Sequence, residues 1–177
     1  MLDTRTLGPR MSLGELVMIF DGLFDREAYR LETLDYYDSS LYSRWLAGEA
    51  YDRSGWDQIL AGYAADGKTV CRVHLLPDAL TSYLVHEIEF YRGSVQKGED
   101  IRVIRKDDAP GDIPEGFDYW LFDRRLAALM EYDEKGVCTA VTLTADSATV
   151  HKCVRWRDEA VAGAMTLVEY DRKVQAC

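Results

Sequence analysis

Three strand-like segments follow one another between residues 119 and 144, and only turn-length connections separate them. They read YWLFD, LAALMEY and VCTAVTLT, and the turn DEKG joins the last two. Connections this short allow only antiparallel pairing, because a parallel return needs a crossover of a dozen or more residues. This part of the chain therefore predicts antiparallel strands.

Helical and strand patterns alternate along the rest of the chain. Apolar residues at helical spacing, together with capping residues, predict helices at about 13–23, 39–48, 54–67, 81–98 and 147–164. Period-two alternation predicts strands at 29–34, 69–76 and 100–106.

These patterns together predict the fold class. Helices mixed with strands that are joined by hairpin-length turns indicate an α+β fold. We expect a flexible leader at residues 1–11 and a single domain over 12–177, with a mainly antiparallel sheet packed by helices. The apolar stripes of the helices at 81–97 and 147–164 predict that both cover one side of that sheet.

Charge and cysteine usage narrow the environment and the partners. The 177 residues carry a formal net charge of -10, which disfavours binding to nucleic acid or to an anionic membrane. The apolar runs are too short to span a bilayer. The four cysteines form no C-x-x-C motif, and the first residues do not resemble a signal peptide. We therefore expect a cytoplasmic protein with reduced thiols.

Standard signatures of catalysis and metal binding are absent from the sequence. There is no G-x-G-x-x-G, phosphate-binding loop, G-x-S-x-G or H-E-x-x-H motif. A zinc site could be sought at His151, Cys153 and Cys138, but residues two apart on a helix point to different faces, and a fourth ligand is missing. The sequence predicts no metal and no cofactor, and folding that is indifferent to chelation.

Polar residues occur at alternate positions on two predicted strands. Arg30 and Glu32 share a face of the first strand, and Arg72 and His74 share a face of the second. Arg102 on the third strand could join them if the strands are neighbours in register. One interpretation is a solvated outer face. The other is the floor of a polar cavity suited to a carboxylate or a phosphate, both of which arginine binds bidentately.

The stretch FDYWLFD at 117–123 is apolar on both faces, which is typical of an interior strand. Asp118 and Asp123 would lie at its ends and cap turns or pair with Arg124 or Arg125, and Trp120 would form a wall of the polar cavity. We expect Arg72→Ala to impair function more than stability. The alternative is that Arg72 holds Glu32 in a buried pair, in which case its removal is strongly destabilising.

The predicted helix at 81–97 carries a candidate acid–base group. Tyr83 and Glu87 are one turn apart, with His86 nearby. A buried glutamate beside such residues suits general acid–base catalysis, so Glu87, Tyr83 and His74 are the candidate catalytic residues. The alternative is an amphipathic helix whose polar face is exposed to water.

Several strings in fixed order carry a family resemblance. They are YRLETLDYY, SGWDQIL, DGKTVCRVHLL, SYLVHEIEF, VQKGEDIRVI, FDYWLFD and VRWRDEAVAGA, and they span about residues 24–170. Together they resemble DUF6879, a family of uncharacterised actinobacterial proteins. The family motifs correspond here to Arg30–Thr33, Arg72–His74, Gly98–Ile101 and Asp118–Asp123. His74 replaces a second arginine and Ala79 replaces a common proline, so a shared ligand is not implied.

The resemblance implies an architecture and a setting. Members are often encoded near helix-turn-helix regulators and small acidic partners. We therefore expect an accessory protein that binds a protein partner or a small anionic ligand through Arg30, Glu32, Arg72, His74 and Trp120. A homodimer is left open. The alternative is a small cofactor-independent tailoring enzyme. An enclosed cavity lined by both arginines and Trp120 would support a site.

Overall fold

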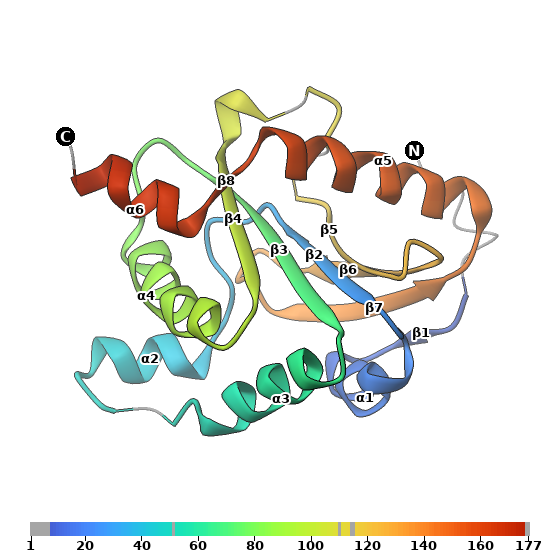
Figure 1. Cartoon of the computed structure of the whole chain (residues 1–177), viewed down its shortest axis with the longest axis horizontal. Helices are drawn as coiled ribbons and strands as arrows, with labels where there is room; N and C mark the ends of the chain where they lie inside the picture. The colour runs from blue at the N-terminus through green and yellow to red at the C-terminus, as the bar shows by residue number, and fades with distance from the viewer. Residues whose placement is uncertain (1–7, 51, 110, 114–115, 176–177) are drawn as a thin grey trace.

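The computed structural model describes residues 8–50, 52–109, 111–113 and 116–175. Within them, eight strands form one sheet in the order β1–β7–β6–β5–β2–β3–β4–β8 (Figure 1). The strands are β1 Arg10–Met11, β2 Glu27–Glu32, β3 Thr69–Leu76, β4 Asp100–Arg105, β5 Asp118–Phe122, β6 Leu126–Tyr132, β7 Cys138–Thr144 and β8 Met165–Thr166. The α-helices are α1 Leu13–Ile19, α2 Ser40–Leu46, α3 Ser54–Ala65, α4 Ser82–Gln96, α5 Ser147–Gly163 and α6 Leu167–Gln175.

Most neighbouring strands in the sheet are antiparallel. Five of the seven pairings run antiparallel, including the two hairpins β5–β6 and β6–β7. The prediction of an α+β fold with a mainly antiparallel sheet is confirmed. The other two pairings, β2 with β3 and β3 with β4, are parallel. Helices α2 and α3 connect the first pair and α4 connects the second, as parallel neighbours require.

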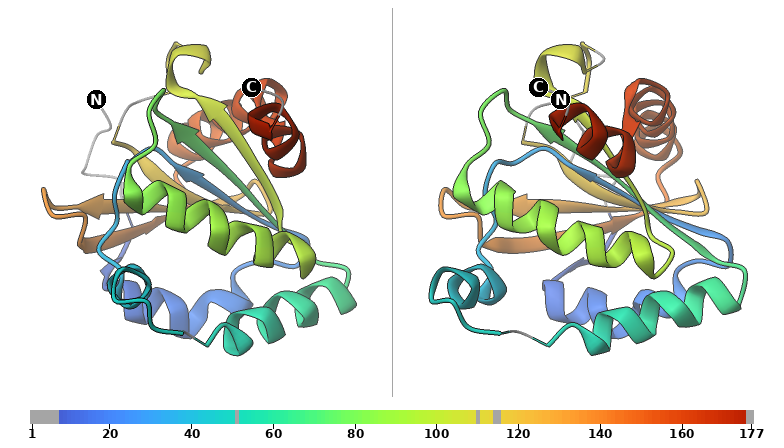
Figure 2. Two further views of the ribbon diagram at one scale, coloured as in Figure 1. Left: turned by 90° about the vertical axis from the view of Figure 1, so that its left-hand side faces the viewer. Right: turned by 60° about the vertical axis from the view of Figure 1, so that its left-hand side comes forward.

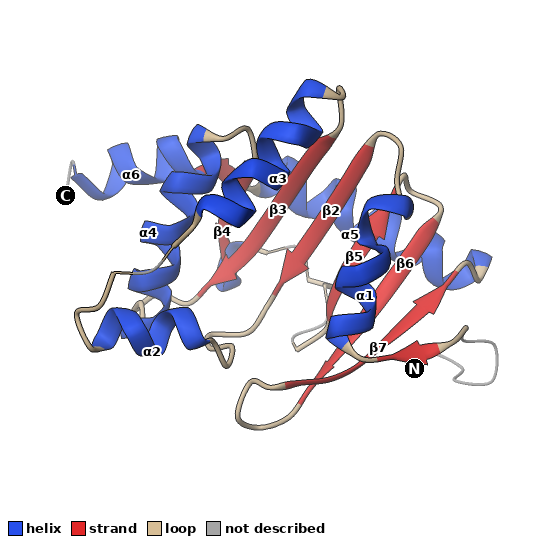
Figure 3. Ribbon diagram, turned by 90° about the horizontal axis from the view of Figure 1, so that it is seen from below, coloured by secondary structure: helices blue, strands red, loops and turns tan. Residues whose placement is uncertain are grey.

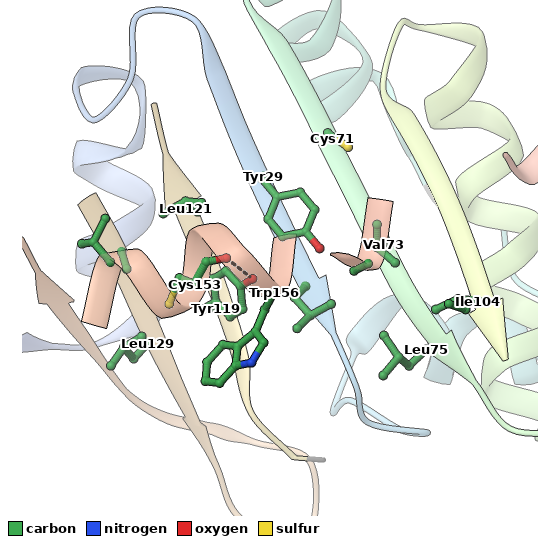
Figure 4. Packing of buried hydrophobic residues seen from close by; sticks show 14 residues of the cluster. Tyr29, Cys71, Val73, Leu75, Ile104, Tyr119, Leu121, Leu129, Cys153 and Trp156 are labelled. Carbon is green, nitrogen blue, oxygen red and sulfur yellow. Dashed lines mark hydrogen bonds between the residues drawn. The ribbon is translucent and has the colours of Figure 1, made fainter. Parts of the chain in front are cut away.

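Helices cover both faces of the sheet (Figure 2). Helix α5 packs on the face that carries Tyr29, Val73 and Tyr119, and these residues form a core cluster with Trp156 of α5. Figure 4 shows this packing, including the hydrogen bond that the Tyr119 hydroxyl donates to the Cys153 carbonyl oxygen at 2.8 Å. Helices α1, α3 and α4 pack on the opposite face. The prediction that the helices at 81–97 and 147–164 share one side is therefore wrong.

The direction of chain progression explains this arrangement. The chain moves from β2 to β3 to β4 in one direction across the sheet, and right-handed crossovers then place both connecting layers on the same face. Helix α5 belongs to a different connection, because it links β7 near one edge of the sheet to β8 at the other edge. It crosses the face that the crossovers leave uncovered.

Strand β5 is the central part of the FDYWLFD segment and lies inside the sheet between β2 and β6. All five residues of the strand are buried. Tyr119 and Leu121 face α5, whereas Trp120 and Phe122 face α1 and α3. The prediction of an interior strand is confirmed. The carboxylate of Asp123 follows the strand and accepts the backbone N–H groups of residues 25, 26 and 27 at 2.7, 2.9 and 2.9 Å.

Short edge elements differ from the sequence-based expectations. Arg10 and Met11, expected in a flexible leader, form β1 and pair with β7. Residues 1–7 of that leader lie outside the described residues. The two-residue strand β8 and helix α6 were not expected, and they cover the β4 edge (Figure 1). In the described part of the chain, no helix is long and apolar enough to cross a bilayer.

Candidate functional site

Strands β2 and β3 lie side by side and run parallel (Figure 3). Their register brings the predicted polar residues together. Arg30 is opposite Arg72 and Glu32 is opposite His74, so all four lie on the face that α4 covers. Trp120 is opposite Arg30 on the other neighbouring strand. The predicted convergence on one face is confirmed, whereas the ligand-binding role of these residues stays a prediction.

This face is not solvated. Arg30 and Glu32 are each 4% exposed and His74 is fully buried. The interpretation as an outer face in contact with water is therefore wrong. Arg102 does not join the group, because it is opposite Val73 and so points to the α5 side, where it pairs with Asp100 at 3.1 Å.

The cysteine-based zinc interpretation fails on geometry. His151 is exposed on α5, whereas Cys153 on the same helix is fully buried in the core. Cys71, Cys138 and Cys153 are free thiols. Cys177 lies outside the described residues.

A surface cleft of about 300 Å³ opens above the polar residues. Glu32 is the last residue of β2, so the cleft lies near the carboxyl ends of the parallel strands, where open sheets usually bind ligands. Its wall includes both arginines and Trp120, as expected, but it is an open surface cleft and not the enclosed cavity that would support a site most directly. The lining residues are Leu13, Arg30, Glu32, Tyr37, Asp38, Ser39, Arg72, Tyr83, Glu87, Trp120, Met130, Tyr132, Gly136 and Cys138.

Carboxylates engage both arginines. Arg72 donates from Nη1 to both oxygens of Glu32 at 2.8 and 2.9 Å and from Nε to Glu99 at 3.0 Å. Arg30 contacts Glu32 at 3.3 Å and Asp118 at 3.4 Å, and its guanidinium lies 5.5 Å from the Trp120 ring centroid. Burial alone would raise the pKa of Glu32, but Arg72 and Arg30 outweigh it and lower that pKa. Glu32 is therefore ionised at neutral pH.

Asp118 fastens one wall of the cleft. Its buried carboxylate accepts the backbone N–H of Thr33 at 2.9 Å and the Thr33 hydroxyl at 2.8 Å. It also accepts the hydroxyl of Tyr37, which lines the cleft. Asp118 was expected to cap a turn or pair with Arg124 or Arg125, but its arginine partner is Arg30 in the interior, at 3.4 Å. The Asp123 carboxylate is the one that pairs with Arg125, at 3.3 Å.

Helix α4 places an acid–base group at the cleft. Tyr83 donates to Oε1 of Glu87 at 2.9 Å, and both residues line the wall. Tyr83 is only 5% exposed and the Glu87 side chain 12%, so the interpretation of this helix face as wet is wrong. Burial raises the pKa of Glu87 to about 7, with the charge of Glu32 acting in the same direction and His74 opposing it. Such a group can take up or release a proton near neutral pH.

His74 lies beneath the cleft, and each of its two ring nitrogens lies within hydrogen-bond distance of an oxygen atom. Its Nε2 atom is 2.9 Å from the carbonyl oxygen of Leu34, and its Nδ1 atom is 3.0 Å from the Tyr91 hydroxyl. Tyr91 in turn donates to Oε2 of Glu32 at 2.6 Å. His74 is thus linked to β2 and α4 but is shielded from solvent.

Sequence reasoning misses three residues of this network. Tyr91 belongs to the apolar stripe of its helix, and nothing in helical spacing distinguishes a core tyrosine from one that bridges Glu32 and His74. No sequence pattern singles out Tyr132 either, although its hydroxyl accepts a hydrogen bond from Arg30 at 2.7 Å. Glu99 lies in the string Gly98–Ile101 that carries the family resemblance, and that string is the one available indication of its contact with Arg72.

The fold of this chain has a counterpart among solved structures. No curated protein matches the sequence. The crystal structure of a phospholipase D family member, Nuc from Salmonella typhimurium, is similar over 89% of this chain and 95% of that chain, with a TM-score of 0.52 and 9% identity. NucT from Helicobacter pylori is similar over 89% of this chain and 97% of that one, with a TM-score of 0.48 and 10% identity.

At 9% identity the likeness to Nuc concerns the fold alone and transfers no activity to the cleft. The sequence comparison is more specific. The model of DUF6879, a domain of unknown function, matches residues 15–172, which is most of the chain and includes every residue of the cleft except Leu13. The chain therefore belongs to the DUF6879 family.

Proposed function

We propose that this chain binds a small polar molecule in the cleft between α4, the 33–39 loop and the β6–β7 hairpin. The observation that carries this proposal is the lining of the cleft, where Trp120 and Tyr83 supply apolar walls and Arg72 and Glu87 supply polar groups. Its volume of about 300 Å³ is at the lower end of the range of about 300–1,000 Å³ that is usual for ligand pockets. We therefore expect a small ligand that carries several polar groups.

The charge of the ligand follows from the contacts of the arginines. The Nε and Nη1 groups of Arg72 already donate to Glu99 and Glu32. A bidentate grip on an incoming anion would therefore break existing pairs. We infer that an uncharged or cationic ligand fits better than the anionic one expected from the sequence, and both classes belong in the test.

The test is a binding screen with a cleft-filling variant. Ser39 lines the cleft, and its side chain makes no cap hydrogen bond to α2, so Ser39→Trp fills the space without removing a structural contact. Ser40→Trp is the matched control, because Ser40 is exposed on the next position. A panel of small amines, alcohols, amides, carboxylates and phosphates is screened by ligand-observed NMR and thermal shift, with a chelator present.

We expect at least one panel member to bind the wild type and Ser40→Trp and to lose binding in Ser39→Trp. Equal binding to both variants, or no binding by any class, would count against the cleft as a ligand site. The same experiment also tests the alternative that the protein is an enzyme. It predicts that a bound molecule is chemically altered by the wild type and left intact by Glu87→Gln.

One observation favours a protein partner as a second candidate. Helix α1 exposes several apolar side chains beside the cleft, and contiguous apolar surface is typical of an interaction site. They are Leu13 at 40%, Val17 at 65%, Met18 at 86% and Ile19 at 43% exposure. Self-association through α1 predicts a dimer that Met18→Lys dissociates. Sedimentation equilibrium checks it, and a wild-type monomer at high concentration would rule it out.

A further inference from the structure

Three metal-ligating side chains from three different elements converge beneath the cleft. One donor atom each of Glu32 on β2, His74 on β3 and Glu87 on α4 lies within 4.8 Å of the other two, and no other such group occurs among the residues that the structure describes. The Nδ1 atom of His74 lies 3.4 Å from Oε2 of Glu87 and 3.8 Å from Oε2 of Glu32. Two donors of a first-row ion at about 2.1 Å are about 3.0–3.5 Å apart, which is close to the two distances from His74.

A hydrogen bond to the backbone fixes the orientation of the His74 imidazole. Because the Leu34 carbonyl oxygen can only accept, the hydrogen bond at 2.9 Å places a proton on Nε2 of His74. In the neutral ring, Nδ1 then carries a lone pair. Its nearest neighbour is the Tyr91 hydroxyl at 3.0 Å, with the two glutamates next, so a bound ion would take the place of the Tyr91 contact. Histidines that bind metals are typically held in this way, with the second ring nitrogen donating to a carbonyl or a carboxylate.

An unpartnered oxygen points into the same space. Oε2 of Glu87 is buried and has no hydrogen-bond partner among the described residues, although Oε1 accepts from Tyr83. A buried carboxylate oxygen without a donor is costly, and such an atom in a native structure calls for a ligand, an ion or a proton. It lies on the side of Glu87 that faces His74.

The charges around the cluster also favour a cation. Four carboxylates and only two guanidinium groups share this interior network, so the network carries an excess of two negative charges when all are ionised. The carboxylates are Glu32, Glu87, Glu99 and Asp118, and the guanidinium groups are Arg30 and Arg72. A divalent cation would offset this difference.

We propose that Glu32, His74 and Glu87 form a binding site for a first-row divalent transition-metal ion. One imidazole nitrogen and two carboxylate oxygens suit Mn²⁺ or Zn²⁺ better than a soft thiolate-seeking ion. The ion reaches the site through the cleft, since Glu32 and Glu87 line its wall. This site does not depend on the proposed small molecule, although it shares the cleft with it. It departs from the prediction of metal independence, which considers only His151, Cys138 and Cys153.

The test is calorimetric titration of the chelator-treated full-length chain with Mn²⁺, Zn²⁺ and Mg²⁺, with Mn²⁺ binding also followed by electron paramagnetic resonance. We expect one equivalent of Mn²⁺ or Zn²⁺ to bind with at least tenfold preference over Mg²⁺. Glu87→Gln keeps the size of the side chain but removes the charge, and we expect it to weaken binding at least tenfold. Glu89→Gln is the matched control, because Glu89 is an exposed glutamate on the same helix.

Binding that is equal in Glu87→Gln and wild type would overturn the site, as would no binding of Mn²⁺ or Zn²⁺ to the wild type. Circular dichroism of each variant verifies the fold. The failure of this proposal is distinguishable from failure of the proposed function, because the small-molecule screen is carried out with a chelator present. Ligand binding there would survive the loss of the metal site, and cation binding would survive a negative screen.

Discussion

The Nη1 atom of Arg72 lies 2.8 Å from Oε1 and 2.9 Å from Oε2 of Glu32, so one guanidinium nitrogen contacts both oxygens of a nearly buried carboxylate. The same arginine holds Glu99, whose side chain is 1% exposed. From sequence alone Arg72 could either bind an anionic ligand or form a structural pair with Glu32. These contacts favour the second.

Arg72→Ala should accordingly be strongly destabilising. The substitution leaves two buried carboxylates without their main partner, and breaking a buried pair in this way costs about 3–5 kcal/mol of the free energy of unfolding. Urea denaturation at pH 7 measures it. Arg72→Lys should recover only part of the loss, because a single ammonium does not reproduce the planar arrangement of Nε and Nη1.

The matched control for this experiment is Arg102→Ala on the neighbouring strand. Arg102 is 29% exposed and pairs with Asp100 across solvent-accessible surface, so its removal should cost less than about 1 kcal/mol. If Arg72→Ala unfolds at the same urea concentration as the wild type, the Arg72–Glu32 pair is not structural. A ligand-binding role for Arg72 would then be favoured.

Asp123 should stabilise the protein in a pH-dependent way. Burial acts to raise its pKa, but the backbone N–H groups of residues 25, 27 and 26, with Arg125, lower it below the ordinary value. Because the folded-state pKa is depressed, the stabilisation is present above the unfolded-state pKa of about 3.9 and is lost as the pH falls through the folded-state value.

Asp123→Ala should therefore lower the free energy of unfolding by about 2–3 kcal/mol at pH 7, and the difference from wild type should shrink below about pH 4. Urea denaturation over a series of pH values checks this. Asp25→Ala is the control, since the Asp25 side chain is 85% exposed. A difference that persists unchanged at the acid end would show that the carboxylate charge is not the cause.

Strand alternation was sufficient to predict part of the site from sequence. Arg30 with Glu32, and Arg72 with His74, share faces because side chains alternate along any strand. That these two pairs meet depends on the parallel register of β2 and β3, which is set by a crossover of more than thirty residues and not by a turn. The same uncertainty explains Arg102, because a shift of one residue in register exchanges the two faces.

Hairpin geometry predicted β5–β7, since short turns leave no alternative pairing. The edge strands β1 and β8 carry weak local signals, because two-residue strands show no periodicity and depend on the sheet they join. The meeting of Glu87 with His74 combines a helix with a strand and depends on how α4 is seated. Tertiary packing decides that seating, and no local pattern encodes it.

Tyr37→Phe should test how firmly the loop before α2 is held. The Tyr37 hydroxyl donates to the fully buried Asp118, and its removal leaves that carboxylate with fewer donors. We expect a loss of about 1–2 kcal/mol in the free energy of unfolding. The adjacent Tyr36→Phe is the control, because Tyr36 is 42% exposed. A result that is the same for both tyrosines would mean that this hydrogen bond adds nothing to stability.

Gly136 in the turn between β6 and β7 should tolerate no side chain, because the 33–39 loop packs against its backbone. The residue has φ +75°, and an added Cβ would lie 2.8 Å from the carbonyl oxygen of Tyr36 and 3.1 Å from the amide nitrogen of Asp38. The same amide donates to the Gly136 carbonyl oxygen at 2.9 Å. The neighbours are backbone atoms and cannot rotate away, so the loop and the hairpin must separate.

Gly136→Ala should therefore cost about 2 kcal/mol or more, from the strained backbone and the clash together. Because Asp38 and Gly136 both line the cleft, ligand or cation binding there should weaken as well. Gly62→Ala inside α3 is the matched control: nothing lies within 4 Å of its added Cβ, and we expect a gain of about 0.4–1 kcal/mol. Thermal and urea denaturation of both variants measure the difference. If Gly136→Ala proves as stable as Gly62→Ala, the loop is not fastened to the hairpin, and the wall of the cleft is less fixed than its contacts indicate.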